Sequence, residues 1–286
     1  MTEFPAGLSA LTDRYDVLLC DVWGVIHNGV HSFPEACDAL VAWRAQGGQV
    51  VLISNAPRPS YDVIPQLDEL GVPRAAWSAF VSSGDATRAL LAERAPGPVW
   101  RIGPDRDAPL YAGLDLDFAG PEEAAFIGVS GLVDDETEVA EDYRERLAVA
   151  AARGLTLICA NPDRVVQRGD RLIHCGGALA DVYESLGGAV LMAGKPFAPI
   201  YDLALDEAAI LLGRPVDRAR VLCVGDGVIT DVKGAHDQGL ACRFIAKGIH
   251  GEAAVGPDGA LNPEAVAGLL AAESVGATHA MGDLVW

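Results

Sequence analysis

The chain has 286 residues, 50% of them hydrophobic, which is enough apolar material for one large core or two medium-sized domains. Its 40 acidic residues outnumber 21 lysines and arginines, and the net charge of −19 disfavours nucleic acid polymers and anionic membrane surfaces as partners. We find no signal-peptide pattern, no run of about 18 apolar residues that predicts a membrane span, and no C-x-x-C pair among the six cysteines. We therefore expect a cytoplasmic protein with reduced thiols.

Short apolar segments alternate with amphipathic segments along the chain, which predicts alternating strands and helices. The expected strands are 16–20, 49–54, 99–102, 125–129, 155–160, 189–192, 220–224 and 241–245. The expected helices include 33–46, 137–153, 198–212 and 230–238. This alternation is typical of an α/β fold, in which helices cover both faces of a parallel sheet.

Polar residues follow four of the predicted strands. Asp21 comes directly after the first strand, Ser54 and Asn55 end the second, Lys195 follows strand 189–192, and Asp226 follows strand 220–224. The carboxyl ends of parallel strands line the crevice in which such sheets bind ligands. We therefore expect these side chains to meet in one site.

Each of these residues also has an ordinary structural explanation. Asp21 or Ser54 can cap a helix or a turn, and Lys195 can be a solvated surface lysine. A shared functional site would explain all of these residues together. A carboxylate after a buried strand needs a metal or hydrogen bonds to compensate for lost solvation, and a nearby ammonium neutralises a carboxylate and a phosphate together.

The segment VGDGVITD carries two acids five residues apart, Asp226 and Asp231. Mg²⁺ is bound in proteins by a few carboxylates together with waters and phosphate oxygens. Asp21 and Asp226 are therefore candidate ligands, and Asp231 is a candidate supporting acid. The glycines of this segment lack the third glycine of a dinucleotide-binding motif, so we expect no nucleotide cofactor.

The ordered motifs D-x-x-G-V, S-N, G-K-P and G-D-x(4)-D resemble those of the haloacid dehalogenase superfamily, and the resemblance runs nearly end to end. The long insertion, with ANPD at 160–163, looks like the α/β cap of class IIA members, the p-nitrophenyl phosphatase-like and ribonucleotide monophosphatase-like proteins. The resemblance implies a Rossmann-like parallel-sheet core of residues 1–83 plus 189–286 and an inserted α/β C2-type cap of residues 84–188. Because class IIA relatives often self-associate through the cap, it also implies a homodimer.

The resemblance implies catalytic roles for Asp21, Ser54 and Lys195, and substrate contacts for Ser54, Asn55 and Lys195. Asp21 would attack phosphorus and form an aspartyl-phosphate. Ser54 would hydrogen-bond the transferring phosphoryl group, with Asn55 beside it, and Lys195 would steady the charges of Asp21 and the phosphoryl group.

The resemblance also implies a metal set and a cap contact. Mg²⁺ would be held by Asp21, Asp226 and the backbone carbonyl of Trp23, with Asp231 in support. Asn161 and Asp163 of the ANPD segment are expected to contact the substrate, although an ordinary Asx-Pro turn also explains that segment.

Trp23 is a departure from the phosphatase pattern D-x-D-G, in which a second Asp protonates the leaving group and then activates water. Such acid–base help is worth about 10²–10⁴-fold, and an indole does not titrate usefully. Three consequences are open: substrates with good leaving groups such as aryl or acyl phosphates, a replacement proton donor such as His27, or phospho-ligand binding with little or no turnover.

We therefore expect a Mg²⁺-dependent phosphatase acting on a small phosphorylated metabolite. One alternative is a phospho-ligand-binding protein. Another is a 2-haloacid dehalogenase, because that branch also lacks the second Asp. Dehalogenation does not need Mg²⁺, so the presence of both Asp226 and Asp231 favours the phosphatase.

Overall fold

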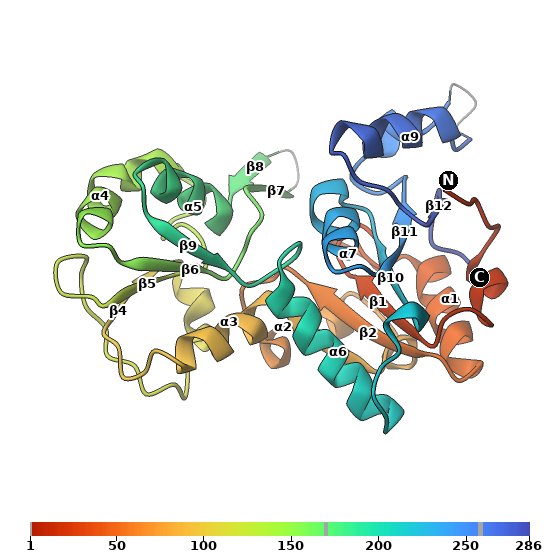
Figure 1. The fold of residues 1–286 in the computed structure, drawn as a ribbon, viewed down its shortest axis with the longest axis horizontal. Helices are drawn as coiled ribbons and strands as arrows, with labels where there is room; N and C mark the ends of the chain where they lie inside the picture. The colour runs from red at the N-terminus through yellow and green to blue at the C-terminus, as the bar shows by residue number, and fades with distance from the viewer. Residues whose placement is uncertain (1, 169–170, 257–259) are drawn as a thin grey trace. The chain divides into compact units, whose positions relative to one another are not determined.

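The computed structural model describes residues 2–168, 171–256 and 260–286, which form two compact units (Figure 1). The first unit comprises Met1–Ser54, Ile64–Val81 and Tyr201–Trp286, and the second comprises Asn55–Val63 and Ser82–Ile200. Each unit has its own parallel sheet, which confirms the prediction of an α/β fold. Among the described residues, no helix has the length and hydropathy needed to cross a membrane. All six cysteines are buried.

The first unit is built on a six-stranded sheet in the order β12-β11-β10-β1-β2-β3. Its strands are β1 (Val17–Asp21), β2 (Gln49–Ser54), β3 (Ala79–Ser82), β10 (Val221–Gly225), β11 (Ala241–Ile245) and β12 (His279–Met281). The central strands β1 and β10 run parallel and are buried along their whole length. Their pairing brings the end of β1 beside the end of β10, which matters for the site described below.

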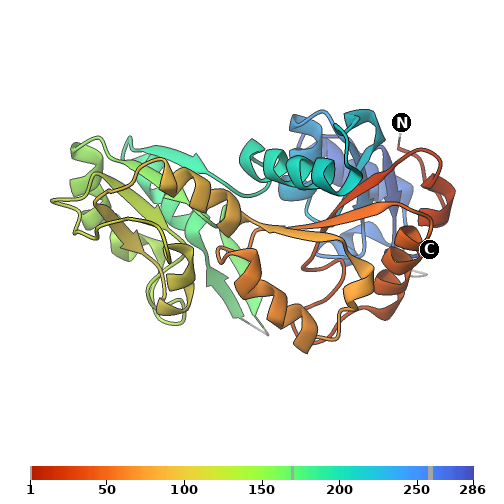
Figure 2. The same ribbon diagram turned by 90° about the horizontal axis from the view of Figure 1, so that it is seen from below.

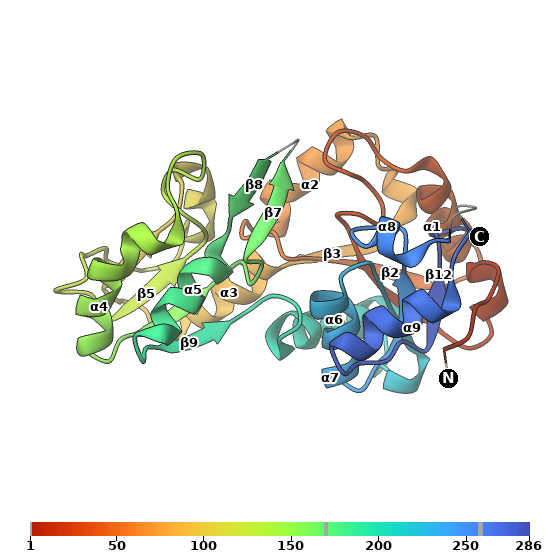
Figure 3. The same cartoon turned by 90° about the horizontal axis from the view of Figure 1, so that it is seen from above.

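Helices lie on both faces of this sheet, with α1 on one side and α6 and α7 on the other (Figures 2 and 3). The helices of this part of the chain are α1 (Pro34–Ala45), α2 (Ser60–Glu69), α6 (Ala198–Leu212), α7 (Lys233–Asp237), α8 (Gly251–Ala254) and α9 (Pro263–Ala272), and the unit boundaries fall within α2 and α6. Proline at the first position of α1 and α9 favours the start of each helix. A Cβ at Gly234 of α7 would collide with the hydroxyl of Tyr201 in α6, so this glycine allows the two helices to pack closely.

The second unit is built on a four-stranded parallel sheet in the order β4-β5-β6-β9. These strands are β4 (Val99–Ile102), β5 (Phe126–Val129), β6 (Thr156–Cys159) and β9 (Ala189–Met192). An antiparallel pair, β7 (Val165–Arg168) and β8 (Arg171–His174), lies apart from this sheet. The helices are α3 (Ser83–Ala92), α4 (Arg144–Ala152) and α5 (Gly176–Ser185).

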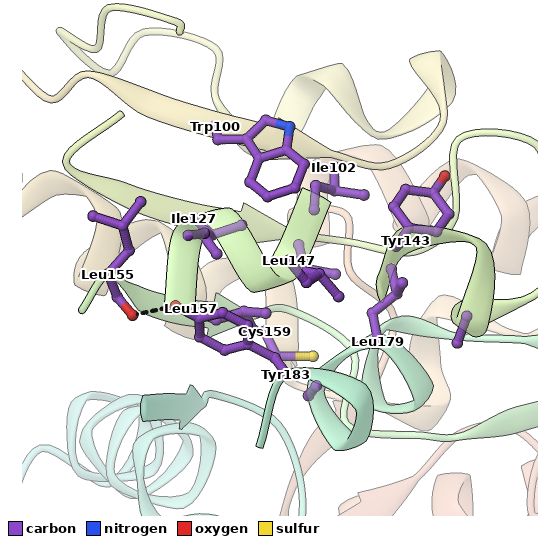
Figure 4. Close-up of a cluster of buried hydrophobic side chains, with 14 of the residues drawn as sticks. Trp100, Ile102, Ile127, Tyr143, Leu147, Leu155, Leu157, Cys159, Leu179 and Tyr183 are labelled. Atoms are coloured by element: carbon purple, nitrogen blue, oxygen red, sulfur yellow. Dashed lines mark hydrogen bonds between the residues drawn. The ribbon is translucent and has the colours of Figure 1, made fainter. Parts of the chain in front are cut away.

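Side chains alternate between the two faces of this sheet, so a hydrophobic core forms on each side. On one side, Ile127 and Leu157 of the strands meet Leu147 of α4 and Tyr183 of α5 (Figure 4). The Tyr183 hydroxyl donates a 2.6 Å hydrogen bond to the carbonyl of Leu155, which satisfies the one polar atom of that ring. The intervening strand residues pack on the other face with α3 and a 3₁₀ helix, in a cluster of Leu91, Val99, Leu110, Tyr111, Phe126, Ile158 and Ala160.

Four predicted strands, 49–54, 99–102, 189–192 and 241–245, have the predicted bounds, and the other four differ by one residue at one or both ends. The predicted helix 198–212 is also observed with its bounds. Helix 137–153 is instead a 3₁₀ helix (Ala140–Tyr143) followed by α4, and helix 230–238 is a π-helical turn (Val228–Val232) followed by α7. Strands β3, β7, β8 and β12 were not predicted.

Strand β9 differs from expectation in its sheet. We expected strand 189–192 in the core of residues 1–83 plus 189–286, but it pairs with β6 in the second unit's sheet. The expectation that Lys195 follows a strand of the same sheet as Asp21 is therefore wrong. The physical reason is that hydrogen bonds to a neighbouring strand decide which sheet a strand joins, and an apolar run does not carry that information.

Candidate active site

Three carboxylates come together at the carboxyl ends of β1 and β10 in the first unit, and we call them the acidic trio. They are Asp21 at the end of β1, Asp226 directly after β10, and Asp231 in the π-helical turn that follows. All three are buried, and each offers an oxygen within 4.8 Å of the others. Like charges this close repel unless a cation or protons compensate. Because every donor is a hard carboxylate oxygen, the trio fits the ligand preference of Mg²⁺.

Main-chain atoms from two loops hold Asp226. The N–H of Ile249 donates a 2.7 Å hydrogen bond to its Oδ2. A Cβ at Gly24, where φ is +82°, or at Gly248 would collide with the same carboxylate oxygen. Both glycines are therefore needed for the backbone to approach Asp226 this closely. Sequence reasoning missed Gly248 and Ile249, and the only available signal was a glycine shortly after the predicted strand 241–245.

Asp231 stiffens the loop that carries Asp226. Its Oδ2 accepts hydrogen bonds from the N–H of Gly227 at 3.0 Å and from the hydroxyl of Thr230 at 3.2 Å. A Cβ at Gly225 would collide with the Asp231 carboxyl group, so the strand end also packs directly against it. These contacts are compatible with the predicted role of Asp231, which is to support the loop that carries Asp226.

The loop between β1 and α1 carries Trp23, whose side chain is 50% exposed, and His27, which is buried. The Nδ1 of His27 accepts a 3.0 Å hydrogen bond from the N–H of Gly29, and its carbonyl accepts one from Gly24 at 2.8 Å. Burial lowers the pKa of His27 to about 4. The imidazole is therefore neutral at pH 7, and it does not provide the protonated acid that Trp23 lacks.

In the second unit, the predicted residues Asn55, Asn161, Asp163 and Lys195 form one hydrogen-bond network. The Oδ1 of Asn55 accepts from the N–H of Lys195 at 2.7 Å, and its Nδ2 donates to the carbonyl of Lys195 at 3.1 Å and to Asp163 Oδ1 at 3.0 Å. Asn161 Oδ1 in turn accepts from the N–H of Asp163 at 3.0 Å. The Asn55 side chain thus hydrogen-bonds both the N–H and the carbonyl of Lys195, a residue 140 positions away in the sequence.

The predicted site residues therefore fall into two groups. The first unit brings together Asp21, Asp226 and Asp231, and it also contains Trp23 and the partly buried Ser54 at the end of β2. The second unit contains the Asn55–Lys195 network. The boundary between the units falls between the consecutive residues Ser54 and Asn55.

Comparison with known proteins identifies the family. A haloacid dehalogenase-like hydrolase model matches residues 18–117, and a HAD-hydrolase-like model matches residues 192–272. A crystal structure of a hydrolase of the haloacid dehalogenase-like family from Brucella suis 1330 is 45% identical, covers 99% of this chain and 100% of its own, and superimposes with a TM-score of 0.86. The chain belongs to the haloacid dehalogenase-like family. The superfamily and the hydrolase class predicted from the motifs are confirmed.

More distant relatives in this family are phosphatases. The p-nitrophenyl phosphatase from Archaeoglobus fulgidus shares the fold with a TM-score of 0.73 at 20% identity, over 94% of this chain and 97% of that one. A 5'-nucleotidase from Bacillus subtilis is 24% identical over 82% of this chain and 88% of its own. The D-glycerol 3-phosphate phosphatase from Mycobacterium tuberculosis is 26% identical over 85% of this chain, and the match spans 66% of that enzyme. The predicted phosphatase class agrees with these relatives.

Proposed function

We propose that this protein is a Mg²⁺-dependent phosphatase that hydrolyses a small phosphorylated metabolite. The observation that carries the proposal is the acidic trio, three buried carboxylates that come together beside the ends of β1 and β10 in a chain of this hydrolase family. The names of its relatives, which include several phosphatases, support the reaction type. A cytoplasmic location and a homodimer are parts of the same proposal and come from the sequence and the family resemblance.

The metal part of the proposal rests on donor chemistry. Asp21, Asp226 and the backbone carbonyl of Trp23 would hold Mg²⁺, with Asp231 in support. When bound, Mg²⁺ would neutralise negative charge on the phosphate and orient it. This matters in a protein of net charge −19, which otherwise repels an anionic substrate.

The covalent chemistry falls to Asp21. Its carboxylate oxygen would form a bond to phosphorus as the bond to the leaving oxygen breaks, and the bonding electron pair would depart with that oxygen. Water would then attack phosphorus, release the Asp21 carboxylate and yield inorganic phosphate. Ser54 would donate a hydrogen bond to a phosphoryl oxygen, and the Lys195 ammonium would offset the charge on Asp21 and the phosphoryl group.

Asn55, Asp163 and Asn161 have a supporting part in this proposal. Because both N–H groups and the oxygen of the Asn55 amide already contact Lys195 and Asp163, Asn55 would act by fixing the position of Lys195. Asn161 would hold the Asp163 end of the network. Contact of these three side chains with the substrate, expected from the family resemblance, stays a prediction.

A phospho-ligand-binding protein with little turnover is the second candidate. Two observations favour it, the absence of a carboxylate at Trp23 and the buried, neutral state of His27. Binding without turnover would keep the metal and phosphate contacts but lack the proton transfers.

The test is phosphate release from p-nitrophenyl phosphate and a panel of phosphorylated metabolites, with Mg²⁺ and with chelator. We expect Mg²⁺-dependent release that Asp21→Asn abolishes and Asp226→Asn strongly reduces. Asp206→Asn, an exposed acid on α6, is the matched control and should behave as wild type. Binding of phosphate esters without release would favour the second candidate. Halide release from a 2-haloacid that persists in chelator would refute the phosphatase and point to dehalogenation.

A further inference from the structure

Large apolar side chains are exposed around the acidic trio. Trp23 is 50% exposed, Ile229 is 50% exposed and Ile249 is 77% exposed. The backbone links two of these residues to the trio. The N–H of Ile249 donates a hydrogen bond to Asp226, and Ile229 lies in the same π-helical turn as Asp231. Single exposed hydrophobic residues are ordinary, but these three each lie within two residues of a member of the acidic trio or donate a hydrogen bond to one, which calls for an explanation.

Trp23 is tied to the trio through its neighbour Gly24. A Cβ at Gly24 would meet the carboxylate of Asp226, so the backbone next to Trp23 touches the trio directly. Trp23 is therefore the sequence neighbour of Gly24, whose backbone lies against the carboxylate of Asp226.

Two contacts restrain the indole ring of Trp23. It packs against Gly29, where φ is +83° and where a Cβ would collide with the ring. It also meets the buried His27 ring edge-to-face, with ring centroids 5.4 Å apart and planes at 77°. A large aromatic ring that is supported on one side and half exposed on the other is preorganised for stacking, since little side-chain entropy remains to be lost on binding.

We propose that Trp23, with Ile229 and Ile249, contacts the leaving group, and that the substrate is a phosphate monoester whose leaving group is aromatic. This inference rests on the proposed function, because it assumes a phosphoryl group at Asp21. A phenolic leaving group departs as phenoxide with the electron pair of the broken P–O bond and takes its proton from solvent afterwards. An aromatic ring at residue 23 in place of the acid then fits a leaving group that needs no proton donor.

The first test measures binding and does not need turnover. Phenylphosphonate and methylphosphonate carry the same charge when both are dianions, and neither is hydrolysed. In the presence of Mg²⁺, calorimetry should show phenylphosphonate binding about 5- to 20-fold more tightly, as expected for one aromatic contact with its buried area. Trp23→Ala should remove this preference and Trp23→Phe should retain part of it. Equal affinities for the two phosphonates in the wild-type protein would overturn the inference.

Matched variants separate the role of the ring from general damage. Gly29→Ala leaves the indole intact but displaces it, so the preference should fall as in Trp23→Ala. Ile249→Ala should weaken the preference, whereas Ile210→Ala should not, since Ile210 is a 72% exposed isoleucine on α6. Circular dichroism confirms that each variant is folded. Retention of the preference in both Gly29→Ala and Trp23→Ala would refute a role for the ring.

A kinetic test distinguishes this inference from the proposed function. Phenyl and naphthyl phosphates have leaving groups of similar acidity, so a higher kcat/KM for the naphthyl ester that is lost in Trp23→Ala reports the contact and not the chemistry. Hydrolysis of both esters at equal rates refutes the aromatic contact and leaves the phosphatase standing. An aryl preference in phosphonate binding without any phosphate release refutes the phosphatase and leaves the aromatic site standing.

Discussion

Asn55 offers the sharpest test of how the second unit presents Lys195. Asn55→Ala removes the hydrogen bonds to the N–H and the carbonyl of Lys195, a residue that is only 2% exposed. Each buried backbone group left unsatisfied costs about 1–3 kcal/mol, so after partial replacement by water we expect a loss of roughly 2–4 kcal/mol. For a unit of this size that is a fall in Tm of roughly 10 °C.

The catalytic consequence should appear in kcat. A catalytic group displaced by about 1 Å can cost about 10²-fold, so Asn55→Ala should lower kcat by that order while KM changes little. Asn55→Asp keeps the oxygen that accepts from Lys195 but loses both donors and places a second carboxylate against Asp163, so it should be equally damaging. A direct substrate contact would instead raise KM and leave Tm unchanged.

The control for this prediction lies in the same neighbourhood. The hydroxyl of Ser83 is buried close to Gly194 and, among the described residues, has no hydrogen-bond partner. Ser83→Ala removes this unsatisfied hydroxyl, so it should leave stability unchanged or raise it by about 1 kcal/mol and leave kcat unchanged. Calorimetric unfolding and steady-state kinetics of the three variants are the measurements. Wild-type Tm and kcat in Asn55→Ala would refute the reasoning that this amide positions Lys195.

Two further predictions concern the first unit. Gly248→Ala should push the Asp226 carboxylate aside and weaken Mg²⁺ affinity about 10- to 100-fold in a metal titration, whereas Gly251→Ala, whose Cβ would meet no atom within 4 Å, should not. The guanidinium of Arg220, bound to Asp16 at 2.6 and 2.8 Å, holds the pKa of that carboxyl below its ordinary value. Its stabilisation is therefore present above about pH 4 and lost as the pH falls through the lowered pKa. Asp16→Asn should cost up to about 1 kcal/mol in urea unfolding at pH 7, and the difference from wild type should vanish in strong acid.

Local signals in the sequence were sufficient for the positions of many elements. The segments 49–54 and 241–245 became strands with the predicted bounds because short buried segments with β-branched or aromatic side chains favour a strand. The first contains Val50, Val51 and Ile53, and the second contains Phe244 and Ile245. The short elements β3 and β12 escaped prediction because three or four apolar residues do not show a period.

The acidic trio was predictable for a physical reason. Asp21 ends β1 and Asp226 directly follows β10, and strands of a parallel sheet end at the same edge. The spacing of Asp226 and Asp231 spans a single turn, so local geometry alone brings them together. Their shared motif with the haloacid dehalogenase family carried the same information.

The fold class, most strand positions and the acids at two strand ends could therefore be predicted from the amino-acid sequence, because these depend on interactions within one segment. The folded chain was needed to show that β9 pairs with β6, that Asn55 hydrogen-bonds the backbone of Lys195, and that Gly248 and Ile249 contact Asp226. These contacts join residues 22 to 140 positions apart. A polar side chain or a glycine at such a position looks the same in the sequence whether or not it contacts a distant residue. Hydrogen bonds and steric fit between distant segments exist only once the chain has folded.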